Sequence, residues 1–373
     1  MNTVIHGTVD PRFIKVKDAF ADNFGDGLEH GAAVAMMLEG KLVVDLWAGH
    51  SDKAKTKPWQ RDTIANVWSS TKGVVATAVA MLVERSQLHY DRPIADVWPE
   101  FAAGGKEHIT LDQTMSHVSG LNGVNVPISE DDLIAWTPYV NALAAMTPNW
   151  KPGTDCAYHA LSYGHLASEP LRRVTGKSIG RFVRQEIARR LGIEFYIGVP
   201  EEHDHRCAEM IEGAGCNDWV KLVLSSPYPQ ACANPTPVAT APNNRRWRAA
   251  EVPGGNGHCD ARALATIYGD ICGANSKLIT KETRAEASRI RYRGQDTSFG
   301  FPTVWAAGFR VEDETYGIWA SKQTIGHGGW GGTMAFGDPE AGLGFAYVTN
   351  NMLGFEAIDP RREKLIFAIY DSL

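Results

Sequence analysis

Ser69 and Lys72 are the residues of this sequence whose types and spacing best fit covalent catalysis. They lie three apart in WSSTKGVVATAVAMLVERSQ, residues 68–87, so at helical spacing they share one face. The segment is almost wholly apolar from Gly73 to Val83, which predicts a buried helix with the serine at its start. A lysine at the mouth of such a helix is costly to bury unless it is paired or used.

This Ser-x-x-Lys arrangement has the parts of an activated serine nucleophile. If Ser69 caps the helix, the helix N-terminus supplies positive potential and free N–H groups for an oxyanion. Lys72 lies one turn later, within reach of the serine hydroxyl, and partial burial can lower the pKa of an amine enough for it to accept a proton. The bare motif is common by chance, so the prediction depends on this context.

Three other patterns are better explained by structure than by chemistry. The pattern G-x-S-x-G of hydrolases occurs in GKSIG (176–180), but the residues before it are helical in pattern, so we interpret Gly176 as a helix stop and Ser178 as the cap of the next helix. The histidines and cysteine of HDHRC (203–207) lack a second ligand pair, which favours a solvated loop. The glycines of PGGNGHCD (253–260) lack a strand–helix context and indicate a turn.

Composition restricts the classes of function. The chain has 373 residues, is 44% hydrophobic and has a net charge of −6, which suits one large domain or two interleaved ones. No basic run suggests a nucleic-acid partner. No apolar run reaches membrane-spanning length and the start lacks a signal core, so we expect a cytoplasmic protein without membrane contact. Six cysteines without a CxxC pair predict reduced, buried thiols, and we expect no metal and no cofactor.

Strand-like segments occur at both ends of the chain, with helices between them. Two strands are predicted within 32–49, joined by a turn at Glu39-Gly40. Further strands are predicted at 303–311, 314–320, 332–338 and 343–351. Helices are predicted at 11–29, at 360–371 and in the segment that begins at residue 69. The stretch 90–250 is helical and loop-rich, with a long irregular loop at 226–244. We therefore predict an α+β fold with one antiparallel sheet built from both termini, flanked by terminal helices, and an inserted helical region.

Four segments together resemble the serine β-lactamase and penicillin-binding-protein superfamily, in particular its class C-like family VIII carboxylesterases. Residues 69–72 match the Ser-x-x-Lys nucleophile motif. TMSHVSGL (114–121) resembles LLxHTSGL, and WKPGTDCAYHALSYGHL (150–166) resembles W-x-PG-x-x-x-x-Y-x-N. Residues 325–351 resemble the strand that closes the active site and the DP turn after it. The resemblance implies a serine β-lactamase-like fold, with a sheet region of residues 1–68 plus 252–373, a mainly helical region of 69–251, and the active site between them.

The resemblance also implies catalytic roles. Ser69 is the nucleophile, and Lys72 and Tyr158 form the base system that takes its proton; which of these two is the base stays open. The oxyanion hole consists of the backbone N–H groups of Ser69 and Trp330.

Counting back from Asp338-Pro339 places His327-Gly328-Gly329 where β-lactamases carry Lys-Thr-Gly. His327, Gly328, Gly329 and Trp330 would then contact the substrate. A competing assignment puts the same motif at Trp330-Gly331-Gly332.

Two departures from the family pattern indicate the substrate. Ala160 replaces the asparagine of Y-x-N, and His327 replaces a fixed lysine cation with a group that is partly charged near neutral pH. We therefore predict a serine hydrolase that cleaves short-chain carboxylic esters of small molecules through an acyl-enzyme. Alternatives are an acyltransferase, an amide hydrolase or weak β-lactamase on the same residues, and a non-catalytic scaffold. Neither the natural ester nor the oligomeric state follows from the sequence.

Overall fold

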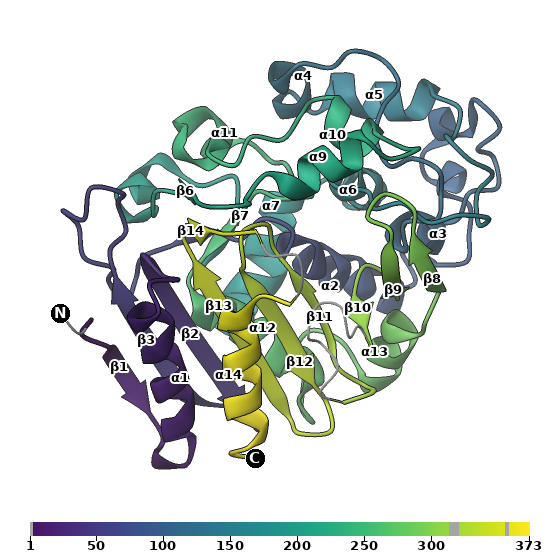
Figure 1. The fold of residues 1–373 in the computed structure, drawn as a ribbon. Coiled ribbons are helices and arrows are strands. Elements are labelled where there is room, and N and C mark those ends of the chain that lie inside the picture. Colours follow the sequence, from purple (N-terminus) through teal and green to yellow (C-terminus); the bar gives the residue numbers. More distant parts are fainter. Residues whose placement is uncertain (1–2, 313–320, 355–357) are drawn as a thin grey trace.

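Nine strands of the described residues form one antiparallel sheet through the centre of the molecule (Figure 1). The computed structural model describes residues 3–312, 321–354 and 358–373. The strand order is β1-β3-β2-β13-β12-β11-β10-β9-β8, so strands from the two ends of the chain lie side by side. The strands are β1 (His6–Val9), β2 (Gly31–Leu38), β3 (Lys41–Gly49), β8 (Tyr292–Asp296), β9 (Phe301–Trp305), β10 (Arg310–Val311), β11 (Ile325–Gly328), β12 (Met334–Asp338) and β13 (Leu343–Thr349). The predicted α+β fold with a sheet from both termini is confirmed.

Side chains alternate across the sheet, and each face has its own core. In β2, Val34 and Met36 pack on the side of α1 (Ile14–Gly25) and α14 (Pro360–Tyr370), which lie against each other. Ala33 and Ala35, which alternate with them, face α2 (Thr71–Glu84) and α12 (Ala261–Cys272) on the opposite side (Figure 1). This period-2 pattern is the sequence signal of a strand that is covered on both faces.

The helical region and the smaller sheets complete the structure. The other α-helices are α3 (Leu111–Met115), α4 (Glu130–Ile134), α5 (Thr137–Ala145), α6 (Ser162–Thr175), α7 (Ile179–Phe182), α8 (Arg189–Leu191), α9 (Asp218–Leu224), α10 (Gln230–Ala233), α11 (Arg245–Ala249) and α13 (Lys281–Ser288). Short strands pair as β4 (Ala65–Asn66), β7 (Gly257–Cys259) and β5 (Phe195–Ile197), and as β6 (Ile211–Glu212) with β14 (Asn351–Met352). Shorter helical turns are 3₁₀ at Pro11–Phe13, Ile94–Asp96, Pro99–Ala102, Glu201–Arg206 and Ala241–Asn243, and a π turn at Val183–Ala188.

Most predicted strands are present, with one break. The hairpin of β2 and β3 turns at Glu39 and Gly40, whose φ angles of 48° and 76° are those of a tight type I′ turn. The predicted strand 303–311 is divided into β9 and β10, because Gly308 adopts a φ of 85° between them. The predicted strand 314–320 lies outside the described residues.

The structure places each of the minor motifs in a local element of the chain. Gly176 ends α6 in the left-handed conformation, and the Ser178 hydroxyl accepts a hydrogen bond from the backbone of α7. Residues 203–206 lie in a 3₁₀ turn, and the described residues contain no group of three or more His, Cys, Asp or Glu side chains placed to hold a metal. All six cysteines are unbonded, and all but Cys207 are buried.

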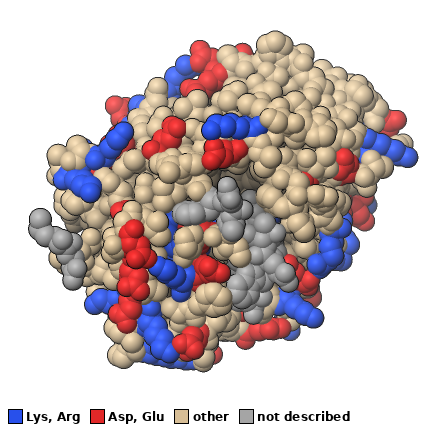
Figure 2. All heavy atoms as spheres, viewed as in Figure 1, with Lys and Arg blue, Asp and Glu red and all other residues tan. Residues whose placement is uncertain are grey.

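The surface carries mixed charge. On the face drawn in Figure 2, Lys and Arg side chains are interspersed with Asp and Glu. None of the helices in the described ranges is both long enough and apolar enough to cross a membrane.

Candidate active site

The side chains of Ser69 and Lys72 meet at the start of α2. Lys72 Nζ lies 2.9 Å from Ser69 Oγ, 2.7 Å from the carbonyl oxygen of Ala160 and 2.6 Å from that of Gly254. Lys72 is fully buried, whereas Ser69 is partly exposed. The hydroxyl is therefore open to a substrate, and the amine behind it is enclosed by protein.

The backbone around the serine differs in one respect from the prediction. The helix begins at Thr71 with Ser70 as its N-cap, so Ser69 lies one residue before the cap and its hydroxyl is not used in capping. Ser70 Oγ donates instead to the carbonyl of His327, 3.2 Å away. Trp68, directly before the serine, has a φ of 44°, in the left-handed region that bulky residues rarely adopt. Such strain in a bulky residue occurs most often at functional sites.

Lys72 is placed to be neutral. Its burial, with a smaller contribution from the nearby Arg310 guanidinium, holds the pKa of Lys72 well below the usual value for an amine. Within the described residues its partners are two carbonyls and a hydroxyl, with no carboxylate. A neutral amine has two N–H donors, which match the two carbonyls, and one lone pair, which then faces the Ser69 hydroxyl. This arrangement lets Lys72 accept the serine proton.

Tyr158 lies beside this pair. Its ring centroid is 4.9 Å from Lys72 Nζ, and the ring is buried. It packs against Trp305, with the ring centroids 5.9 Å apart and the planes nearly parallel, and against Phe299 at 5.6 Å. His117 contacts the other side at 4.9 Å and accepts a 3.0 Å hydrogen bond from the backbone N–H of residue 159. The two segments predicted from the family resemblance, 114–121 and 150–166, thus meet behind the tyrosine.

Neutral imidazoles surround the lysine and the tyrosine. Burial lowers the pKa of His159 to about 3 and holds the pKa values of His117 and His327 well below the usual value for histidine. His159 also shares a 2.9 Å hydrogen bond with Ser119. None of these three histidines adds positive charge near Lys72 at neutral pH.

The end of β11 lies directly against the turn that carries the serine. A Cβ atom on Gly329 would lie 2.4 Å from the backbone oxygen of Val67 and 3.3 Å from Ser70 Oγ. On Gly331 and Gly332 it would instead meet Met352 and Arg361, away from the serine. Of the two alternatives for the third motif, His327-Gly328-Gly329 is therefore the one that lies next to Ser69.

Two backbone N–H groups at this junction have no acceptor among the described residues. Neither Ser69 nor Trp330 donates a backbone hydrogen bond there, whereas Ser70 N–H and Gly329 N–H do. The Gly329 N–H bonds to Thr333 O at 2.6 Å, and Gly332 N–H bonds back to Gly329 O at 3.3 Å, which closes a turn with Trp330 in it. Unused backbone N–H groups are what an oxyanion hole requires, so these two remain available for that role.

His327 is more enclosed than the sequence suggested. Its side chain is buried, Nδ1 lies 2.6 Å from Gly328 O, and Nε2 has no partner among the described residues. With its pKa held well below the usual value, it carries no fixed charge at neutral pH. The site therefore lacks a cation at this position.

Aromatic side chains form an apolar wall beside the serine. The Trp330 ring centroid lies 4.7 Å from that of Trp68 and 5.1 Å from that of Trp219, edge to face with the latter. Trp330 Nε1 donates to Cys216 O at 2.6 Å, which ties β11 to the segment that leads into α9. A separate cavity of about 420 Å³ includes Ser178 and Trp136 but none of these residues.

Sequence reasoning missed the two carbonyls that hold Lys72. Ala160 was noted only as a departure from the family pattern, and Gly254 only as part of a turn. Gly254 does lie in a turn, but that turn is buried. The direction of a backbone carbonyl 182 residues away from the lysine leaves no signal in the sequence.

Comparison with known proteins extends these observations. A family model described as Beta-lactamase matches residues 19–368. The esterase/beta-lactamase LipL of Mycobacterium tuberculosis is 32% identical over 364 residues, which is 94% of this chain and 83% of the relative. The crystal structure of a family VIII carboxylesterase is 38% identical with a TM-score of 0.92, covering 99% of this chain and 100% of its own. A penicillin-binding protein homologue from Caulobacter crescentus is 35% identical with a TM-score of 0.90, covering both chains completely.

Proposed function

This chain belongs to the beta-lactamase family, and on that premise we propose that it is a serine ester hydrolase whose acyl-enzyme forms on Ser69. The observation that carries the proposal is the 2.9 Å contact between Ser69 Oγ and a buried lysine without a counter-charge among the described residues. The names of LipL as an esterase/beta-lactamase and of the structural neighbour as a carboxylesterase support the same reaction class.

The mechanism follows from the positions of the side chains. Lys72, together with Tyr158, takes the Ser69 proton while Oγ attacks the ester carbonyl carbon. The N–H groups of Ser69 and Trp330 stabilise the tetrahedral oxyanion. The C–O bond to the alcohol breaks, and the alcohol leaves with the proton. Water then attacks the acyl-enzyme, gives a proton to the same base, and releases the carboxylic acid and free Ser69.

The lining of the site favours short, uncharged acyl groups. A neutral His327 and the methyl group of Ala160 offer neither a cation for a substrate carboxylate nor an amide for a lactam side chain. Trp330 and Trp219 limit the space beside the serine. We propose that kcat/KM for neutral short-chain esters exceeds that for penicillins by at least ~100-fold, the scale of one lost charge-assisted contact.

A substrate panel on the wild type and His327→Lys tests this preference. The variant should narrow the gap by improving carboxylate-bearing substrates more than neutral esters. Equal wild-type efficiency on nitrocefin and p-nitrophenyl butyrate would contradict the esterase proposal, and an unchanged preference in the variant would contradict the role of His327.

Acyl transfer, amide hydrolysis and weak β-lactamase activity remain the second candidates. They share the acylation of Ser69 and differ only in the leaving group or in the acceptor that resolves the acyl-enzyme. The ratio of ester to acid formed when a short alcohol is added separates transfer from hydrolysis. A cytoplasmic location is also part of this proposal.

A fluorophosphonate probe followed by peptide mass spectrometry tests the proposal as a whole. One probe per chain on the peptide with Ser69 is expected, and none on Ser178, which accepts a backbone hydrogen bond at the start of α7. Heat-denatured protein, which has lost the Lys72 contact, is the control and should stay unlabelled. Labelling at Ser178, or at neither serine, would reject the assignment and favour a non-catalytic scaffold.

A further inference from the structure

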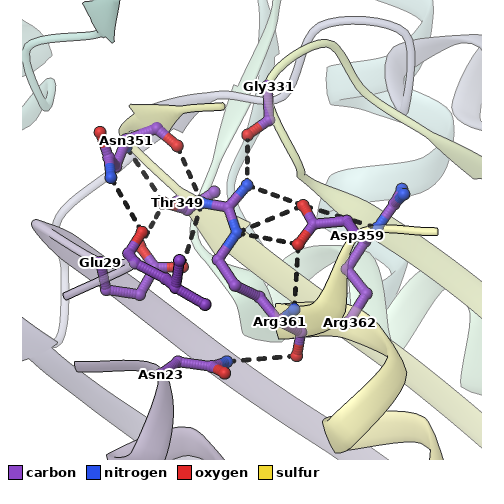
Figure 3. Close-up of polar contacts among 9 residues, drawn as sticks. Asn23, Glu29, Gly331, Thr349, Asn351, Asp359, Arg361 and Arg362 are labelled. Carbon is purple, nitrogen blue, oxygen red and sulfur yellow. Dashed lines mark hydrogen bonds and ion pairs between the residues drawn. The ribbon is translucent and has the colours of Figure 1, made fainter. Parts of the chain in front are cut away.

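A buried polar network surrounds Arg361, in the first turn of α14 (Figure 3). The Arg361 side chain is fully buried. Its guanidinium lies between two carboxylates: Nη2 is 2.7 Å from Asp359 Oδ2, and Nη1 is 3.3 Å from Glu29 Oε1. Glu29 is itself held by a 2.6 Å hydrogen bond from Thr349. The network thus joins the C-terminal helix, the end of β13 and the segment before β2.

The guanidinium also holds the backbone of the turn after β11. Nη2 donates to the carbonyl oxygen of Gly331 at 2.7 Å, and the N–H of Leu353 donates to the same oxygen at 3.2 Å. Nη1 donates to the carbonyl oxygen of Asn351 at 2.9 Å. Arg361 therefore fixes two backbone segments with one planar group, a task that suits the fork of an arginine and not the single charge of a lysine.

The turn is shaped to accept this contact. Gly331 and Gly332 have φ angles of 84° and 126°, which residues other than glycine rarely adopt. A Cβ on Gly332 would lie 2.1 Å from Arg361 Nη2, so only glycine lets the guanidinium come this close. Trp330 directly precedes these glycines, in the turn closed by the hydrogen bond from Gly332 N–H to Gly329 O.

We infer that Arg361 is a positioning residue for the oxyanion hole: by holding the Gly331 carbonyl, it anchors the turn after β11, which carries the Trp330 N–H two peptide units earlier. This inference rests on the proposed function, because it takes that N–H as the second oxyanion donor. A donor that is displaced rather than removed should cost part of the 10²- to 10³-fold that a missing donor costs, so we expect a loss of about 10- to 100-fold.

Arg361→Lys and Glu29→Gln are the matched pair that tests the inference. Arg361→Lys keeps a cation near Asp359 but cannot serve both that carboxylate and Gly331. Glu29→Gln removes the carboxylate that faces Arg361 Nη1 and leaves the hydrogen bond from Nη2 to Gly331 intact. For each variant, kcat and KM with p-nitrophenyl butyrate, the inhibition constant of a boronic acid and the melting temperature are measured.

Arg361→Lys should lower kcat by about 10- to 100-fold with KM little changed, and should weaken the boronic acid by a similar factor. The boronic acid imitates the tetrahedral oxyanion, so its affinity reports the hole itself. Glu29→Gln should keep the kcat and the boronic acid affinity of the wild type even where its melting temperature falls. Equal loss of kcat in both variants, or loss that follows melting temperature alone, would overturn the inference.

If Arg361→Lys does not fold, the charge-balanced double variant Glu29→Gln with Arg361→Gln is measured in the same way. Failure of both to fold, with Glu29→Gln stable, would assign Arg361 to folding and reject the positioning role. A wild type without ester hydrolysis or Ser69 labelling would instead reject the proposed function. An active wild type with unaffected Arg361→Lys rejects only this inference.

Discussion

Lys72 and Arg361 are both basic residues with fully buried side chains, yet among the described residues only Arg361 has carboxylate partners. Among the described residues Lys72 contacts two carbonyls and a hydroxyl, and its pKa is held well below the usual value. Arg361 lies between Asp359 and Glu29, and these carboxylates hold its pKa above the usual value despite burial. One buried cation can lose its proton, and the other cannot.

The difference shows that burial of a basic side chain can have two opposite consequences for its charge within one fold. Desolvation without a counter-charge turns an amine into a base. Desolvation with two carboxylates and well-aligned acceptors gives a fixed cross-link, because breaking it would leave uncompensated charge in the interior. Lys72, the proposed base, lies on α2, and Arg361 holds the turn after β11.

The largest expected loss of activity comes from removing the Ser69 hydroxyl, which Lys72 contacts. Ser69→Ala should lower the hydrolysis of p-nitrophenyl acetate and butyrate by at least ~10⁴-fold, because the acyl-enzyme cannot form. Its melting temperature should stay near that of the wild type. Ser178→Ala, the matched control, should keep most of the activity because the Ser178 hydroxyl caps α7 and donates to Glu251, away from Ser69. An inactive Ser178→Ala with an active Ser69→Ala would contradict the site.

Replacing Lys72 with arginine is the most direct test of the difference between the two buried basic residues. Lys72→Arg places a permanent charge where a neutral amine is proposed and cannot give up its proton, so it should lose at least ~100-fold in kcat, the loss also expected for Lys72→Ala. The readout is kcat at pH 8 with the melting temperature as a check on folding. An active Lys72→Arg would mean that positive charge, and not a neutral amine, is what the site needs.

Tyr158→Phe tests whether the base acts alone. We expect a loss of ~100-fold in kcat, the usual size for a general base. The double variant with Lys72→Ala should lose much less than the product of the single losses, since residues that act as one unit are not additive. Multiplicative losses in this double-mutant cycle would show that the two do not share a proton path.

The smallest effect on catalysis is expected for Glu29→Gln, which should instead change how the stability of the fold depends on pH. Burial raises the pKa of Glu29 from 4.5 to about 7, a shift that corresponds to roughly 3 kcal/mol. A raised folded-state pKa stabilises the fold fully below about pH 4.5, and this contribution is lost as the pH rises to about 7. The wild type should therefore lose stability relative to Glu29→Gln between pH 4.5 and 7.5, as measured by urea unfolding. A pH-independent difference would contradict the raised pKa.

Local patterns explain what could be predicted. Ser69 and Lys72 meet because they lie three positions apart at the start of a helix, and Gly176 and Ser178 end and begin helices through their own backbone and side-chain chemistry. The β2–β3 hairpin has its turn at the dipeptide expected to form it. Tyr158 was identified by the family resemblance and not by spacing.

Long-range contacts explain what could not be predicted. The strand 303–311 is broken because Gly308 takes a left-handed conformation, where a Cβ would lie 2.1 Å from the hydroxyl of Tyr163. The full burial of Arg361 could not be predicted, because the sequence PRREKLIFAIY resembles a surface helix with exposed basic residues. Its carboxylate partner Glu29 lies 332 residues away in sequence.

The pairing of β2 with β13 sets the order in which this enzyme can be completed. Met37 lies opposite Gly344, so the centre of the sheet closes only when nearly the whole chain has left the ribosome. Ser69 and Lys72 are made early, but Trp330 and Arg361 are made late. A nascent chain would therefore carry Ser69, the proposed nucleophile, without Trp330, the proposed second oxyanion donor, and we expect no ester hydrolysis during synthesis. Until then the edge of β2 is unpaired, which makes slow closure and a need for chaperones the expected features of its biosynthesis.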